Sequence, residues 1–127
     1  MPAVKIELQK GRDLRQLLEM KNAVLKALVE SLKLPQNDQN IRIMEYEKDL
    51  FQMKPPYEIL IEISMFEGRT KETKKLLYSN IVGALQQKCN IAGEKVLIIL
   101  NEQPLRNWGV RGGYPADEID LGFKVKV

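Results

Sequence analysis

The chain has 127 residues, of which 44% are hydrophobic and 29% are charged, which is enough to build the core of one globular domain. Twenty basic residues nearly balance 17 acidic ones, and no basic run is interleaved with aromatic residues, so we expect no nucleic-acid partner. The sequence shows neither an apolar run of membrane-spanning length nor the apolar core of a signal peptide, so we expect a cytoplasmic protein without membrane contacts. Histidine is absent and Cys89 is the only cysteine, which excludes an internal disulfide, a His-dependent triad and a His or Cys metal cage. We therefore expect no metal and no cofactor, and any catalysis must use carboxylates, arginines, tyrosines or the amino terminus.

The chain opens with a predicted strand, because Val4, Ile6 and Leu8 alternate with polar residues until Gly11 and Arg12. Pro2 follows the initiator Met, and a small second residue permits removal of that Met. The secondary amine of Pro2 would then be the terminus, and burial or nearby cations would lower its pKa. Such an amine can act as a general base near neutral pH. The alternative is that Pro2 only starts the strand.

A long amphipathic helix is predicted next. Asp13 is the expected N-cap, and Gln16 three residues later completes a capping box. Pro35 ends this element, and residues 35–38 have the composition of a turn. One helical stripe is expected to face the core: Leu14, Leu17, Leu18, Val24, Leu25, Leu28 and Leu32.

The chain then repeats this pattern. Ile41 and Ile43 alternate with Arg42 in a second predicted strand, and residues 48–56 form a charged crossover. A nearly continuous apolar strand follows at 59–66, and Gly68-Arg69 ends it. Thr70 is the expected N-cap of a second helix, and a last buried strand is predicted at 96–100. The second helix carries its apolar residues at Leu76, Leu77, Ile81, Ala84 and Leu85.

A single offset of 57 residues relates the two halves without a gap, since it places Gly11-Arg12 on Gly68-Arg69. The same offset places Ala27-Leu28 on Ala84-Leu85 and Ile41 on Ile98. We interpret this as two copies of one β-α-β unit, at 2–57 and 58–103, followed by a C-terminal hairpin or edge strand at 104–127. All three segments belong to a single predicted domain, 1–127.

Each unit should contain two parallel strands joined by a right-handed helical crossover. The result is an α+β fold with a four-stranded sheet and both helices on one face. The strands at 59–66 and from 96 onwards are apolar on both faces, so we expect another subunit to cover the open face. The alternating tail, 121–127, is a candidate edge strand on a neighbouring sheet.

With its Met-Pro start, its two β-α-β copies and a Gly-Arg pair at each helix entrance, the chain resembles the tautomerase superfamily. Leu34-Pro35, Gly68-Arg69-Thr70 and the segment 107–113 carry the resemblance further. In its number of units the chain resembles two-unit members such as malonate semialdehyde decarboxylase, whereas 4-oxalocrotonate tautomerase carries one unit per chain. The resemblance implies a homotrimer.

The resemblance also implies roles for three residues. Pro2 matches the amino-terminal proline, which is the general base or acid of this family. Trp108 matches an aromatic residue that walls the proline pocket and keeps the amine desolvated. Asp38 falls where the decarboxylase has a functional aspartate in a similar turn, although it is equally well explained as a turn residue.

Arginines are the implied carboxylate ligands. Arg12 and Arg69 match the arginine that follows the first strand of each unit, and Arg69 is the stronger candidate. Arg42 lies where short members have another carboxylate-binding arginine. The decarboxylase has a further arginine two positions before the one matched by Arg69, and here that position is Glu67. Alternatively, Arg12 and Arg69 are only surface residues at the helix entrances.

The predicted function is therefore interconversion of the keto and enol forms of a small 2-oxo acid. Pro2 would move the proton, and Arg69, with Arg12 or Arg42 of a neighbouring chain, would bind the carboxylate. A first alternative is a hydratase or decarboxylase in which protonated Pro2 polarises a carbonyl and Asp38 activates water. A second alternative is a trimeric binding protein whose pocket is vestigial. The expected partners are a small carboxylate and further copies of the chain.

Overall fold

The first unit follows the predicted order of elements in the computed structural model, which describes residues 1–127. Strand β1 (Ala3–Gln9) leads into helix α1 (Leu14–Leu32), which returns the chain to strand β2 (Asn40–Tyr46). β1 and β2 are parallel, with Ala3 opposite Asn40 and Gln9 opposite Tyr46. α1 ends at Leu32, three residues before Pro35, because Lys33 adopts the left-handed conformation that closes a helix.

The second unit repeats the first almost residue for residue. Strand β3 (Ile59–Phe66), helix α2 (Lys71–Cys89) and strand β4 (Val96–Gln103) follow one another, and β3 is parallel to β4. α2 begins and ends 57 residues after α1, which is the offset found in the sequence. Side chains cap both helices, since Asp13 accepts from the amide of Gln16 at 2.8 Å and Thr70 from that of Thr73 at 3.2 Å.

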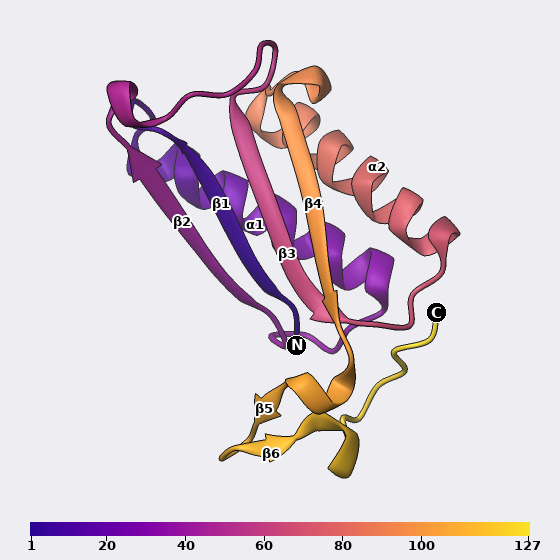
Figure 1. The fold of residues 1–127 in the computed structure, drawn as a ribbon. Helices are drawn as coiled ribbons and strands as arrows, with labels where there is room; N and C mark the ends of the chain where they lie inside the picture. Colours follow the sequence, from indigo (N-terminus) through magenta and orange to yellow (C-terminus); the bar gives the residue numbers. More distant parts are fainter.

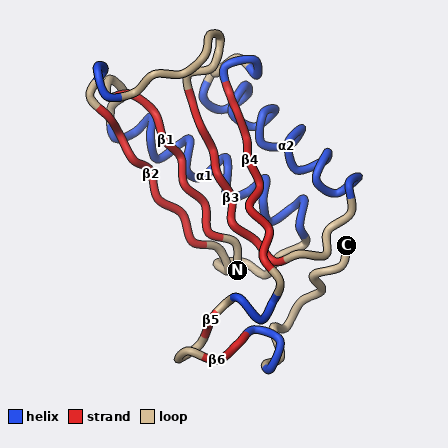
Figure 2. Tube along the Cα trace, viewed as in Figure 1, coloured by secondary structure: helices blue, strands red, loops and turns tan.

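Antiparallel pairing of β1 with β3 joins the two units. Ala3 lies opposite Ser64 and Glu7 opposite Leu60, which gives the sheet order β2-β1-β3-β4. Both helices cover the same face of this sheet, and the other face is open (Figure 1 and Figure 2). This matches the expected four-stranded sheet with two helices on one face.

The core lies between the sheet and the helices. It contains 19 buried residues, among them the inward-facing series Val4, Ile6 and Leu8 of β1. α1 faces this core with Leu28 and Leu32 and with four further apolar residues, Met20, Ala23, Val24 and Ala27. Three apolar residues expected to face inward do not, since the exposed fractions are 72% for Leu14, 42% for Leu18 and 50% for Leu76.

The open face of the sheet mixes apolar and charged side chains. Met44 and Ile99 are each 40% exposed on this face. Between them, Glu7 is buried, accepts a hydrogen bond from the hydroxyl of Tyr46, and lies 3.8 Å from the ammonium of Lys5. The apolar positions on this face are thus interrupted by polar contacts, and these contacts belong to β1 and β2.

The remaining chain lies at the two ends of the sheet. A crossover with one short helical turn, Lys48–Leu50, leads from β2 to β3. After β4, a small hairpin of β5 (Gly109–Val110) and β6 (Tyr114–Pro115) lies beside the end that carries the amino terminus (Figure 1). The last residues form no strand within the chain, and the carbonyl of Val127 accepts a hydrogen bond from the amide of Thr70 at 3.0 Å. Neither helix is long and apolar enough to cross a membrane.

The two strand-terminating glycines offer a matched test of this packing. Gly11 and Gly68 have φ of +143° and +128°, but only at Gly68 would a Cβ meet other side chains, those of Lys126 and Val125 at 3.2 Å. We expect Gly11→Ala to reduce the free energy of unfolding by about 1 kcal/mol through backbone strain, and Gly68→Ala by about 2 kcal/mol. Urea denaturation measures both, and equal losses would show that the tail does not pack on Gly68.

Candidate active site

The sheet topology brings Pro2 and Arg69 to the same end of the molecule. Because β1 and β3 are antiparallel, the start of β1 lies beside the end of β3, after which the chain reaches Arg69. Because β2 is parallel to β1, the turn that carries Asp38 also ends there, and the amide of Asn40 donates to the carbonyl of Pro2 at 2.9 Å. Pro2 itself is buried. Pro2, Asp38 and Arg69 therefore meet at one end of the sheet.

Arg69 is a buried cation with unused hydrogen-bonding capacity. Arg69 is only 6% exposed, and one of its terminal nitrogens, Nη1, donates to the carbonyl of Phe66 at 3.2 Å. Nε and Nη2 are also buried but have no partner. Burial lowers the pKa of Arg69, while the charge of Glu102 acts in the opposite direction. An arginine keeps its charge under such a shift, so this site holds a cation with two free donors.

The ammonium group of Met1 lies in the same site and pairs with Asp38. Its nitrogen is 3.0 Å from Oδ2 of Asp38, and the two side chains are 17% and 22% exposed. Burial lowers the pKa of the Met1 amine, whereas the hydrogen bond and charge of Asp38 raise it. The charges of Arg69 and Arg111 lower this pKa further. A terminal amine in this place is therefore pushed towards its neutral form by burial and by two arginines.

Three aromatic rings cluster at the end of β3. Trp108 contacts Phe66 edge to face, with ring centroids 4.8 Å apart, and Phe123 of the tail stacks on Phe66 at 6.4 Å. The indole N–H of Trp108 is buried and has no partner. Trp108 thus lies beside the same residue, Phe66, that anchors Arg69.

All the unpaired buried polar atoms of the side chains are N–H donors. They belong to Gln39, Arg69 and Trp108, which come from three different segments. Gln39 follows Asp38 and precedes the pairing of Asn40 with Ala3, so it lies near the same end of the sheet. Unpaired buried donors are costly, and a set of donors without matching acceptors suits an anionic ligand.

The other predicted arginines lie elsewhere in the chain. Arg12 follows the opposite end of β1, whose seven residues separate it from the Pro2 end by roughly 20 Å. There it lines a cavity together with Lys48 and Phe51. Arg42 is exposed in the middle of β2, opposite Lys5. One chain therefore brings only Arg69 of the three candidate arginines to Pro2.

Two residues of this end had no role assigned from sequence. Gln39 adjoins Asp38, and nothing in the pattern distinguished it from a turn residue. Arg111 lies in the β5–β6 turn and holds the tail through the carbonyls of Asp120 and Leu121, at 2.7 and 3.4 Å. Its position within a glycine-rich segment marked it as part of a motif, but the approach of the hairpin to the terminus depends on the tertiary fold.

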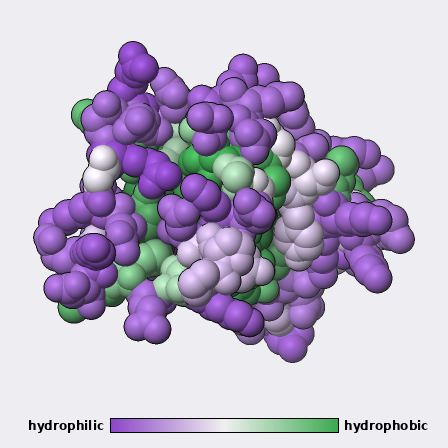
Figure 3. All heavy atoms as spheres, turned by 90° about the horizontal axis from the view of Figure 1, so that it is seen from above, coloured by the Kyte–Doolittle hydropathy of each residue, from purple (hydrophilic) through white to green (hydrophobic).

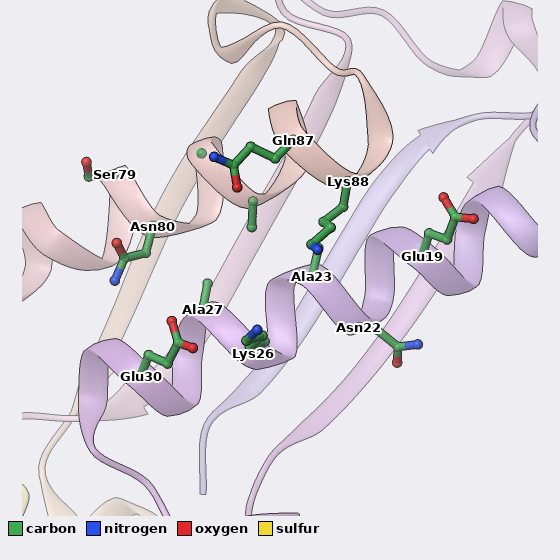
Figure 4. A pocket seen from close by; sticks show the side chains of 12 residues that line it. Glu19, Asn22, Ala23, Lys26, Ala27, Glu30, Ser79, Asn80, Gln87 and Lys88 are labelled. Atoms are coloured by element: carbon green, nitrogen blue, oxygen red, sulfur yellow. The ribbon is translucent and has the colours of Figure 1, made fainter.

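Another cavity, larger than the one that Arg12 lines, lies away from the Pro2 end, and none of these residues lines it. It has a volume of about 710 Å³ and runs between α1 and α2 (Figure 4). Most of the residues that line it are polar, and one of them, Asn80, donates to the hydroxyl of Ser31 at 2.8 Å. No group of three or more acidic or sulfur side chains gathers anywhere in the chain to hold a metal. The Pro2 end is therefore the candidate active site.

Comparisons with known proteins agree with this architecture. A family described as "Tautomerase enzyme" matches residues 38–111. A probable tautomerase of Bacillus subtilis, YusQ, is 28% identical over 121 residues, which cover 89% of this chain and 95% of the relative. A crystal structure of malonate semialdehyde decarboxylase superimposes with a TM-score of 0.79 at 23% identity, over 87% of this chain and 92% of that one.

A second solved structure, a fused 4-OT described as a wild-type symmetric trimer, superimposes with a TM-score of 0.82. It is 20% identical and the match covers 91% of this chain and 96% of that one, so it supports the fold alone. The family match itself spans more than half of the chain. The two β-α-β units, the buried Pro2 and the sequence matches together show that this chain belongs to the tautomerase family.

Proposed function

We propose that this protein is a tautomerase that interconverts the keto and enol forms of a small 2-oxo acid. In this reaction a base removes a proton next to the carbonyl, and the same group returns it to another atom of the substrate. The amine of Pro2 is the proposed base, once Met1 has been removed. While Met1 is present, the Pro2 nitrogen belongs to a tertiary amide and has no useful basicity.

The observation that carries this proposal is the pair of free donors on buried Arg69 next to Pro2. A guanidinium presents Nε and one terminal nitrogen as a fork that fits the two oxygens of a carboxylate. In Arg69 these two nitrogens, Nε and Nη2, lack partners. A bound carboxylate would satisfy both and would place the rest of a 2-oxo acid within the same end of the sheet.

The surroundings of the terminal amine support its role as a base. Burial and the charges of Arg69 and Arg111 lower the pKa of the amine that now stands at this end. The Pro2 amine would lie one residue further along the chain, and the same burial and charges would favour its neutral form. As negative charge develops on the enolate oxygen, the N–H of Trp108 is an additional unpaired donor for it.

A hydratase or decarboxylase activity is the second candidate, and Asp38 favours it. Its carboxylate lies 3.0 Å from the terminal nitrogen, within reach of a water bound in the same site. In that reaction protonated Pro2 would polarise a carbonyl while Asp38 activates the water. Ultraviolet assays with phenylpyruvate, 2-hydroxymuconate and a β-keto acid distinguish the two activities, and turnover of none of them would favour the binding-protein alternative.

We further propose that the protein is a homotrimer in which the open face of each sheet is covered by neighbouring chains. Partly exposed apolar residues on this face, such as Met44 and Ile99, support the proposal. The fused 4-OT of similar fold is described as a symmetric trimer. A covered face would also remove water from the buried Glu7 and from its contacts with Tyr46 and Lys5.

The trimer predicts a mass three times that of the 14.6 kDa chain in sedimentation velocity at micromolar concentration. Ile99→Glu places a charge on the open face and should dissociate the assembly, because a buried unpaired carboxylate is costly. Leu76→Glu is the matched control, since Leu76 is 50% exposed on α2 and Ile99 is 40% exposed on the sheet. A monomeric wild-type protein would contradict the proposal.

Arg69 gives the sharpest kinetic prediction. Removing it should raise KM and lower kcat/KM by about 30- to 1,000-fold, because a charge-assisted pair of about 2–4 kcal/mol is lost. Arg69→Lys should restore only part of this, since an ammonium cannot reproduce the planar fork. Steady-state kinetics on a 2-oxo acid, with circular dichroism to verify folding, measure both effects.

Arg15→Ala is the control for loss of an arginine. Arg15 is 86% exposed on α1 and pairs only with Glu19, at 3.6 Å, so its loss should leave kcat/KM unchanged. Unchanged kinetics in a folded Arg69→Ala would show that Arg69 does not bind the carboxylate.

A further inference from the structure

The repeat gives the molecule a second end that is built like the candidate active site. At an offset of 57 residues, Arg12 corresponds to Arg69 and Phe51 to Trp108. The short helical turn before each aromatic residue also corresponds, at Lys48–Leu50 and Leu105–Asn107. Because β1 and β3 are antiparallel, the end of β1 lies beside the start of β3. At each end of the sheet, the start of the first strand of one unit therefore lies beside the end of the first strand of the other unit.

A cavity of about 520 Å³ occupies this second end, and Arg12 and Phe51 are among the residues that line it. Gln9 also lines it and donates through Nε2 to the carbonyl of Phe51 at 3.4 Å. Gln9 corresponds to Phe66, so this contact matches that of Phe66 with Trp108. Figure 3 looks onto this end of the molecule, where hydrophilic side chains surround hydrophobic patches.

Two cations of this cavity, Arg12 and Lys48, have no partner in a hydrogen bond or ion pair. Arg12 is partly buried. Lys10 pairs with Glu47 at 2.5 Å, and Glu58 with Lys95 at 3.1 Å, so both charges are already compensated. Arg12 and Lys48 then face a single uncompensated carboxylate, Asp49, and the remaining charge suits a small monoanion.

The second end differs from the first at the position of the base. Pro2 corresponds to Ile59, which is fully buried inside the chain as the first residue of β3. Its nitrogen belongs to a peptide bond and cannot accept a proton near neutral pH. A ligand at this end would be bound without being transformed.

We propose that this cavity is a second, non-catalytic site for a small carboxylate, held by the guanidinium of Arg12 between Phe51 and Lys48. The choice of a 2-oxo acid as its ligand rests on the proposed function of the Pro2 end. Each chain then has two carboxylate sites, one of which reacts and one of which only binds its ligand.

Phenylglyoxylate is a suitable probe, because this 2-oxo acid has no hydrogen next to its ketone and cannot tautomerise. Titration of the Met-trimmed protein by calorimetry counts its sites, and nuclear magnetic resonance separates them. The indole N–H of Trp108, the only tryptophan, reports on the Pro2 end, and the amides of Phe51 and Gln52 report on the second end. The expected result is two sites per chain, with shifts at both ends.

Arg12→Ala should abolish the shifts at Phe51 and Gln52 and weaken binding there about tenfold or more, while the Trp108 signal still responds. Arg69→Ala should abolish the response of the Trp108 signal while the shifts at Phe51 and Gln52 remain. Arg15→Ala should leave the responses at both ends unchanged. Shifts at Phe51 and Gln52 without a Trp108 response would support the second site and contradict the proposed function. One site per chain that moves only Trp108, or shifts at Phe51 that persist in Arg12→Ala, would overturn the second site.

Discussion

The antiparallel pairing of β1 with β3 is the contact on which the site depends. Within one β-α-β unit, the full length of the first strand lies between the start of that strand and the arginine that follows it. Pairing Ala3 with Ser64 brings the start of one unit beside the end of the other, so Pro2 meets Arg69. The buried alternation of β1 and β3 against the two helices fixes this register, because a shift of one residue would turn the core side chains to the open face.

The cost of this arrangement is concentrated in a few buried donors. Arg69, Gln39 and Trp108 all carry buried N–H groups without partners, although most buried polar groups in proteins are paired. An anion that accepts from these groups recovers part of that cost on binding. The same cationic surroundings lower the pKa of the terminal amine, as does its burial. In the proposed function, ligand binding and activation of the base thus have a common electrostatic origin.

Much of the fold could be predicted from the repeat, since one offset of 57 residues set the caps at Asp13 and Thr70 and the β-α-β order. What the pattern could not provide was the pairing between units. For that reason it did not show that Arg69 of the second unit lies at the same end of the sheet as Pro2 of the first. Nor could the pattern show that Leu14, the first residue of α1, is exposed. Helical periodicity indicates which side of a helix is apolar, but not how far along the helix the sheet covers that side. The approach of Arg111 depends on a hairpin whose position is set only by tertiary contacts.

The proposed function depends on a free, largely neutral Pro2 amine that moves the proton. Its most direct test compares Met-trimmed and Met-retained samples by intact mass and by kcat/KM on one 2-oxo acid across pH. Only the trimmed form should be active. Because burial and nearby arginines lower the pKa of the amine, its base form persists to lower pH, and the rise of kcat/KM with pH should occur below the pKa of free proline's amine. Equal activity in the two forms would remove Pro2 from the mechanism.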